Sequence, residues 1–255
     1  MTEAFRLRRL PFLGRVSLSL LVLVTAGGYL ASGLFLVEHH QGRDDREGLS
    51  YTDVEGVYHG TTRPALLVDL IESSHPAGIS GADPLDATDR EVLLEWLSGD
   101  AVAENWSNID FGDGYGSPEE IVATACASCH GPGVPLESRA APELSTWDDY
   151  AELAFEREIF PTDESLLLAS THAHALALAT ITFVVVLLGY ATRVWRPIVS
   201  LLALAAAGGL AVDLASWWLA RADAAWVAGV VLGGAAHAGG MGLLLIVVFV
   251  DLWWP

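Results

Sequence analysis

The chain has only two cysteines and two methionines in 255 residues, and its 13 Lys and Arg are outnumbered by 32 Asp and Glu, for a formal net charge of −19. Two cysteines cannot supply a structural zinc site on their own. The negative charge excludes nucleic acid as a partner. The sequence also lacks a nucleophile elbow, a phosphate-binding glycine loop and paired carboxylates in a supporting setting, so it does not indicate hydrolytic or group-transfer chemistry.

The cysteines belong to a Cys-Ala-Ser-Cys-His sequence formed by Cys126, Cys129 and His130 with the residues between them. Thiols at i and i+3 followed directly by a histidine are the pattern for covalent haem, because the thiols bond the two vinyl groups while the histidine reaches the iron. A redox dithiol needs no histidine there. We therefore expect one covalent haem c with His130 as the proximal iron ligand; a plain disulfide is the alternative.

Four apolar segments are each near the length needed to cross a bilayer of about 30 Å. The first follows a run of arginines and the others close the chain, at residues 16–37, 166–190, 198–220 and 226–250. A cleavable signal peptide is the competing interpretation of the first. Because that segment is longer than a usual signal core and no clear small-x-small site ends it, we expect a retained anchor.

The arginines set the expected orientation, because short cytoplasmic flanks carry the positive charge. Four of them lie between Arg6 and Arg15, before the first segment, and Arg193 and Arg196 separate the second from the third. Residues 39–163 are then outside, on the oxidising side of a bacterial inner membrane, where haem attachment takes place. Tryptophans at both expected interfaces agree with this orientation; they are Trp195, Trp253 and Trp254 inside, and Trp217, Trp218 and Trp226 outside.

The external segment, residues 39–165, is long enough for one small domain. It contains 27 Asp and Glu against six Arg, and no Lys. This surface is either a solvated face suited to a salty environment, or one that steers a basic soluble redox partner toward the haem.

Helices dominate the expected structure of this segment. Ser117 and Glu120 form a capping box with Pro118 at the first helical position, so a helix should start there and run into the haem motif. Thr88 and Glu91 form a second capping box. Other expected elements are a helix over residues 63–73, a helix after Thr146, and a loop marked by Gly112, Gly114 and Gly116.

Residues 125–133, with the helix before them, resemble the start of a class I cytochrome c. Residues 62–101, which end in Leu-Glu-Trp-Leu-Ser-Gly-Asp and Ala101, resemble the closing part of bacterial cytochrome c domains, where a Met-Pro is followed by a helix ending in Trp-Ile and a Gly-Ala. Here this part precedes the attachment motif. The order is therefore permuted, or the first half is a second, haem-less domain.

The whole layout also resembles a family of bacterial membrane proteins with an anchor, a single-haem external region and three spans that open with Ser-His-x-His. In this chain the opening is Ser-Thr-His-Ala-His, from Ser170 to His174, with one residue inserted.

The class I resemblance implies a methionine as the sixth ligand of the iron. However, the only methionines are Met1 and Met241, and the latter lies in the last apolar segment. His75-Pro76 stands where the resemblance places Met-Pro, so His75 is a candidate distal ligand. Two imidazoles would give a lower potential than an imidazole with a thioether, and an open position would instead admit nitric oxide, carbon monoxide or oxygen. The rival histidines are His39, His40, His59, His172 and His174.

Ionisable side chains within the apolar segments are costly unless they face the bundle interior or water. Because residues i and i+2 of a helix point about 200° apart, only one of His172 and His174 can face His237. A second haem or a metal between that histidine and His237 is one interpretation, and a quinol or proton site that uses Asp213 is another. The third is hydrogen bonding within a bundle packed through glycines; those near His237 are Gly233, Gly234, Gly239 and Gly240.

These features predict a mainly α protein with a basic tip and anchor (residues 1–38), a small helical c-type cytochrome domain (39–165) and a three-helix membrane domain (166–255). We expect an electron carrier at the periplasmic face of the membrane, whose partner is a redox protein or a quinol-oxidising membrane complex. No catalytic residue is assigned. The alternatives are a subunit of a quinol-linked redox enzyme that uses His237 and Asp213, and a haem-based gas or redox sensor.

Overall fold

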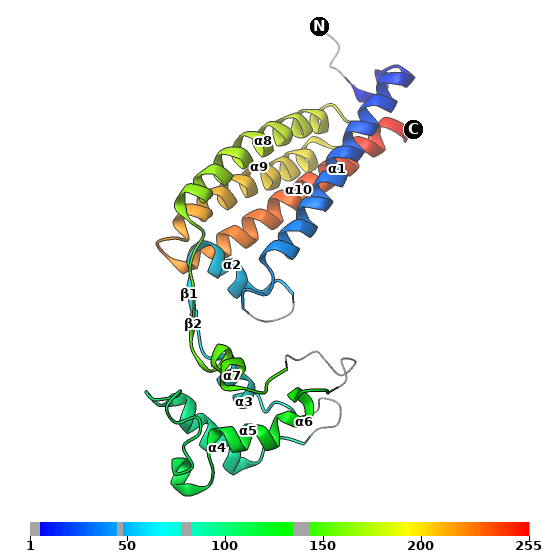
Figure 1. Ribbon diagram of the computed structural model, residues 1–255. Coiled ribbons are helices and arrows are strands. Elements are labelled where there is room, and N and C mark those ends of the chain that lie inside the picture. Colours follow the sequence, from blue (N-terminus) through cyan, green and yellow to red (C-terminus); the bar gives the residue numbers. More distant parts are fainter. Residues whose placement is uncertain (1–5, 45–47, 78–82, 135–142, 255) are drawn as a thin grey trace. The chain divides into compact units, whose positions relative to one another are not determined.

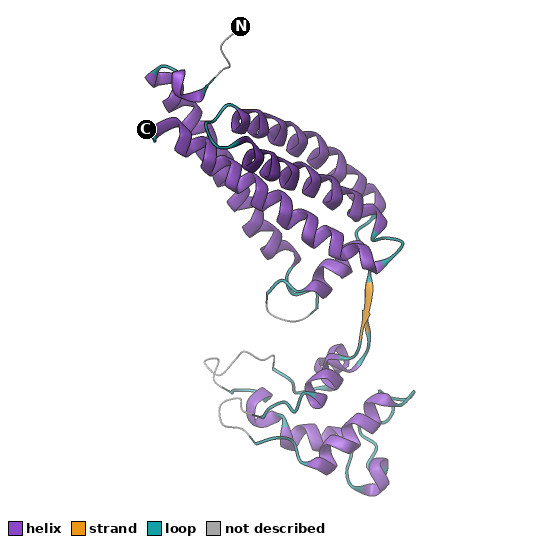
Figure 2. Ribbon diagram, turned by 180° about the vertical axis from the view of Figure 1, so that it is seen from behind, coloured by secondary structure: helices purple, strands orange, loops and turns teal. Residues whose placement is uncertain are grey.

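The computed structural model describes residues 6–44, 48–77, 83–134 and 143–254. The chain is mainly helical, and two three-residue strands pair with each other (Figure 2). It divides into two compact units: unit 1 comprises Met1–Thr61 and Ile159–Pro255, and unit 2 comprises Thr62–Glu158. Unit 2 is thus shorter than the 39–165 domain expected from the sequence, because residues before Thr62 and after Glu158 belong to unit 1.

Four long helices build most of unit 1 and lie side by side, with the start of the first and the end of the last at the same end of the bundle (Figure 1). They are α1 Phe12–His40, α8 Glu164–Tyr190, α9 Arg196–Leu219 and α10 Val227–Trp253. Each is long and apolar enough to cross a membrane, with a mean hydropathy between 1.9 and 2.1. In α1, large apolar side chains such as Leu34, 74% exposed, have no protein over them and need lipid to cover them. The chain is a multi-pass membrane protein, as the four apolar segments predicted.

Glycines bring α9 and α10 into close contact. A Cβ atom added at Gly209, Gly233 or Gly240 would lie 2.5 to 2.6 Å from a backbone nitrogen of the opposite helix. Small residues are what allow membrane helices to approach this closely. Gly239 differs, because no atom lies within 4 Å of its Cβ position. Of the four glycines named from the sequence, Gly233 and Gly240 therefore form the interface.

Short elements close both ends of unit 1. At one end, Leu7 of the 3₁₀ turn η1 (Leu7–Arg9) is fully buried, and the Arg6 guanidinium donates to the Thr192 carbonyl between α8 and α9. At the other end lies α2 (Tyr51–Tyr58), a helix that was not predicted from the sequence and that begins with a Ser50–Asp53 capping box. The turn η4 (Ala224–Trp226) leads into α10.

Unit 2 folds around one hydrophobic core. Its helices are α3 Leu66–Glu72, α4 Ala87–Ser98, α5 Pro118–Ala125, α6 Ala127–His130 and α7 Trp147–Ala154, with the 3₁₀ turn η2 at Phe111–Gly114; strands β1 (Thr61–Arg63) and β2 (Arg157–Ile159) pair where the chain enters and leaves. Residues from α3, α4, α5 and α7 share the core, and Trp96 at its centre is 1% exposed. Segments before and after the Cys-x-x-Cys-His motif thus share one hydrophobic core.

Local signals located most of these helices correctly. The box at Ser117 starts α5 with Pro118 in its first turn, and α7 follows Thr146. The expected box at Thr88 is wrong, because Asp86 caps α4 by accepting from the Thr88 amide. The helix expected from residue 63 begins at Leu66, because Arg63 precedes a proline and is extended in β1.

Candidate functional site

The Cys-x-x-Cys-His motif lies at the junction of two helices in unit 2. The capped helix α5 ends at Ala125, and Cys126 is both its C-cap and the N-cap of the single turn α6 that carries Cys129 and His130. Gly131 follows at once, and a Cβ there would lie 2.5 Å from the Ala127 carbonyl oxygen. The chain can therefore turn away directly after His130 because residue 131 has no side chain.

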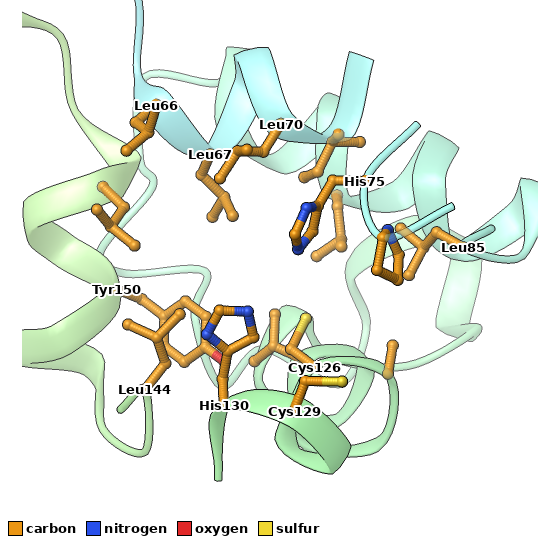
Figure 3. Close-up of a pocket in the computed structure, with 16 residues that line it drawn as sticks. Leu66, Leu67, Leu70, His75, Leu85, Cys126, Cys129, His130, Leu144 and Tyr150 are labelled. Atoms are coloured by element: carbon orange, nitrogen blue, oxygen red, sulfur yellow. The ribbon is translucent and has the colours of Figure 1, made fainter. Parts of the chain in front are cut away.

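Both cysteines and His130 line a single cavity, hereafter the unit 2 cavity (Figure 3). Its empty volume is about 810 Å³, including the part open to solvent. Pockets for small ligands and cofactors are mostly apolar. The walls here are of that kind and come largely from α3, α4, α5 and α7: Leu66, Leu67, Leu70, Ile71, Pro76, Leu85, Leu93, Val122, Ala125, Leu144, Tyr150 and Leu153.

The two thiols are free rather than joined in a disulfide. Cys129 is exposed, whereas Cys126 is half-buried, and burial raises the pKa of its thiol to about 11. The Tyr150 hydroxyl donates a hydrogen bond to the Cys126 sulfur, which offsets part of this rise in pKa. Cys126 is therefore a protonated thiol at neutral pH. Tyr150 carries no sequence signal of its own, since it reaches the motif only through the fold.

His75 faces His130 across the unit 2 cavity (Figure 3). Their ring centroids are 6.0 Å apart and the ring planes are inclined by 56°. His75 occupies this position because the chain turns back after α3: Ser74 has a φ of 64°, and the His75 amide donates to the Leu70 carbonyl over 2.9 Å. Burial lowers the pKa of His75, and the nearby His130 lowers it further, so the neutral imidazole is favoured.

The rival histidines named from the sequence all belong to unit 1. His59 bonds through Nδ1 to the Ala220 carbonyl over 2.7 Å. His39 stacks on Phe35 and contacts the ring of His40. The remaining two, His172 and His174, are exposed residues of α8.

In the membrane bundle, His237 links three helices. It is 5% exposed, its Nδ1 lies 2.8 Å from the Ala206 carbonyl of α9, and its Nε2 lies 3.1 Å from the Tyr29 hydroxyl of α1. The carbonyl can only accept, so Nδ1 carries the proton and Tyr29 donates to Nε2. Both nitrogens are therefore used within the bundle. Tyr29 was missed because nothing in its own segment shows which helix it faces.

Asp213 belongs to a second polar cluster of unit 1. Its Oδ1 accepts from the Trp217 indole over 2.9 Å, and the Trp217 ring contacts both His174 and Tyr58, with centroids 5.4 and 5.6 Å away. Burial raises the pKa of the Tyr58 hydroxyl, and the Asp213 carboxylate adds to this effect. His174 thus contacts α9 through the Trp217 ring.

Among the residues that the structure describes, no three or more His, Cys, Asp and Glu side chains gather as a metal site. A metal held between His174 and His237 alone would need further ligands from other groups. The haem attachment predicted at the motif has no such need, because the porphyrin supplies four ligands and the protein only the axial ones.

The comparison with known proteins concerns the C-terminal part of the chain. A family described as a transmembrane helical domain matches residues 141–255, which include α8, α9 and α10. No curated protein matches the chain, and no solved structure does. The family match supports a membrane protein independently of helix length and hydropathy, and it begins after the Cys-x-x-Cys-His motif.

Proposed function

We propose that the protein is a membrane-bound c-type cytochrome that transfers electrons at the periplasmic face of a bacterial inner membrane. One haem would be attached to Cys126 and Cys129, with His130 on its iron. The observation that carries the proposal is that these three side chains line one apolar cavity together with a second histidine. When bound, the haem supplies one-electron redox chemistry.

The residues of the unit 2 cavity fit this group chemically. Each thioether forms when an S–H adds across a vinyl double bond, with sulfur bonding one carbon and hydrogen the other. This addition needs free thiols, and both cysteines are free. Leucine, isoleucine and valine side chains line much of the cavity, and an apolar surrounding is one way in which a protein tunes a redox potential.

The distribution of arginines supports the proposed orientation. Arg6 bonds to the carbonyl of Thr192, and the Arg193 amide donates to Asp251 near the end of α10, so the arginines near residue 6 and those near residue 193 belong to the same end of the bundle. By the positive-inside rule that end is cytoplasmic. The other end of the bundle holds the C-terminal end of α1 and the N-terminal end of α8, and residues 41–163, which include unit 2, connect these two helix ends. This connection supports a periplasmic unit 2.

The test is production of the full chain together with a haem-attachment system, followed by extraction with acidic acetone and an optical spectrum. We expect haem to remain on the wild-type protein and to be lost from a variant with both Cys126→Ala and Cys129→Ala. Ser128→Ala is the matched control, because it changes the same turn but none of the three groups. A wild-type protein that folds and carries no covalent haem would overturn the proposal.

A second candidate function is a subunit of a quinol-linked redox enzyme. The polar cluster of Asp213, Trp217, His174 and Tyr58 favours it, because ionisable groups in membrane helices mark proton or substrate sites. Oxidation of one quinol to the quinone would release two electrons, which would reduce the single haem of two protein molecules in turn, and two protons, one of which Asp213 would accept while the other passes to water. His237 has no part in this candidate, since both of its ring nitrogens hold helices together.

This candidate predicts that a quinol reduces the haem of the full chain and that Asp213→Asn slows the reduction at least about tenfold, which corresponds to about 1.4 kcal/mol. Asp223→Asn is the control, because Asp223 is an exposed aspartate at the start of η4. Equal rates in the Asp213 variant and the wild type, at equal haem content, would rule the candidate out.

A further inference from the structure

We infer that His75 is the sixth ligand of the haem iron, so that unit 2 holds its haem between two histidines. This inference rests on the proposed function and makes it more specific. It assigns the distal side of the haem to the turn after α3, which precedes the attachment motif in the chain.

The distance between the two rings supports this assignment. A metal–imidazole bond is about 2 Å long and the ring centre lies roughly 1 Å further on, so two imidazoles on opposite sides of one iron have centres about 6 Å apart. The observed separation of the His75 and His130 centroids is 6.0 Å. Any inclination between the ring planes is compatible with such a pair, because each ring can rotate about its own bond to the iron.

Unit 2 offers the iron few other donors. Between residues 62 and 158 the sequence contains two histidines, His75 and His130, and it contains no methionine and no lysine. Both cysteines are committed to the vinyl groups. Tyr150 also lines the unit 2 cavity, but its hydroxyl is engaged with the Cys126 sulfur. His75 is thus the remaining nitrogen ligand with access to the cavity.

The position of His75 is supported from both neighbouring helices. Leu67 and Ile71, on the inner face of α3, are buried in the core, and the Arg90 guanidinium of α4 donates to the Ile71 carbonyl over 3.2 Å. The His75 amide is itself bonded to Leu70. These contacts fix the end of α3, so His75 is held over the cavity and does not depend on a free loop to reach it.

Two imidazole ligands make the iron six-coordinate and low-spin, and they give a lower potential than an imidazole paired with a thioether. A closed sixth position also leaves no vacant site for carbon monoxide. An iron bound by His75 therefore fits an electron carrier, whereas a gas sensor needs the sixth position open.

The experiment compares the full-length haem protein with its His75→Ala, His75→Met and His59→Ala variants. All three keep Cys126, Cys129 and His130, so covalent haem is expected in each. The reduced wild type and His59→Ala should remain low-spin and unchanged by carbon monoxide, whereas His75→Ala should become high-spin and bind it. His75→Met should raise the potential and show a sulfur–iron charge-transfer band, which keeps the test valid if the alanine variant folds poorly.

The outcomes distinguish the inference from the function on which it rests. Covalent haem that stays low-spin and insensitive to carbon monoxide in His75→Ala would overturn the inference and point to another ligand, for which Tyr150→Phe is the next variant. A wild type that binds carbon monoxide at once would also overturn it. Absence of covalent haem from the wild type would overturn the proposed function, and the inference with it.

Discussion

Replacing Gly240 with alanine should destabilise the membrane bundle, although alanine is the better helix former. The added Cβ would lie 2.6 Å from the Ala206 amide nitrogen and 2.9 Å from the Leu202 carbonyl oxygen. Both are backbone atoms of α9, so no side-chain rotation can relieve the contact. Reaching the 3.4 Å of an ordinary contact requires α9 and α10 to separate by about 0.8 Å at this point.

The magnitude follows from three effects. Overpacking a close contact typically costs about 1–3 kcal/mol. Separation of the helices also lengthens the bond from His237 Nδ1 to the Ala206 carbonyl, now 2.8 Å, and such membrane hydrogen bonds average about 0.6 kcal/mol. Alanine returns up to about 1 kcal/mol through helix propensity. We expect Gly240→Ala to lower the free energy of unfolding by about 1–3 kcal/mol.

Gly239→Ala is the matched control, because it makes the same chemical change one residue earlier, where no atom lies within 4 Å. It should be neutral or stabilising by up to about 1 kcal/mol. The assay is unfolding of the purified protein in detergent, by a denaturant titration followed by helical circular dichroism. Equal stabilities of the two variants would refute the close α9–α10 contact described above.

Three further predictions concern the other parts of the molecule. Trp96→Ala should lower the free energy of unfolding of unit 2 by about 3–5 kcal/mol in a denaturant titration, because a fully buried indole is lost from the core. Although burial raises the pKa of Asp53, hydrogen bonds from the amides of Ser50 and Asp44 lower it below its usual value. The contribution of Asp53 to the free energy of unfolding is therefore present above the unfolded pKa of about 3.9 and is lost as pH falls through the folded pKa. Asp53→Asn should cost about 1–3 kcal/mol at pH 7 and weaken this acid dependence in pH-resolved melting curves. In protein made without haem attachment, iodoacetamide should alkylate exposed Cys129 at least about tenfold faster than Cys126, whose pKa of about 11 leaves little thiolate, as peptide mass spectrometry can measure; equal rates would contradict the burial of Cys126.

Features encoded within one segment were predictable from the sequence. A span needs only a long apolar run, and the four predicted segments match α1, α8, α9 and α10 closely. The starts of α5 and α7 were equally local, since a cap and its partner lie three residues apart. Even here the choice between nearby caps was not settled: Asp86 begins α4 two residues before the expected Thr88, because either residue can accept an amide hydrogen bond.

Contacts between distant segments were not predictable in the same way. Only a rough resemblance proposed His75 as a ligand, and its position 6.0 Å from the His130 ring depends on how α3 packs on the rest of unit 2. Tyr29 and His237 are 208 residues apart in the chain, and neither segment shows its facing partner. Such pairs follow from helix packing, which the order of apolar residues in a uniformly apolar helix does not specify.

The most direct test of the central claim is the intact mass of the full chain after production with a haem-attachment system. We predict an increase equal to one haem, retained after denaturation, and the unmodified mass for a variant with both Cys126→Ser and Cys129→Ser. An unmodified mass for the folded wild-type protein would contradict the assignment of residues 126–130 as a haem attachment site.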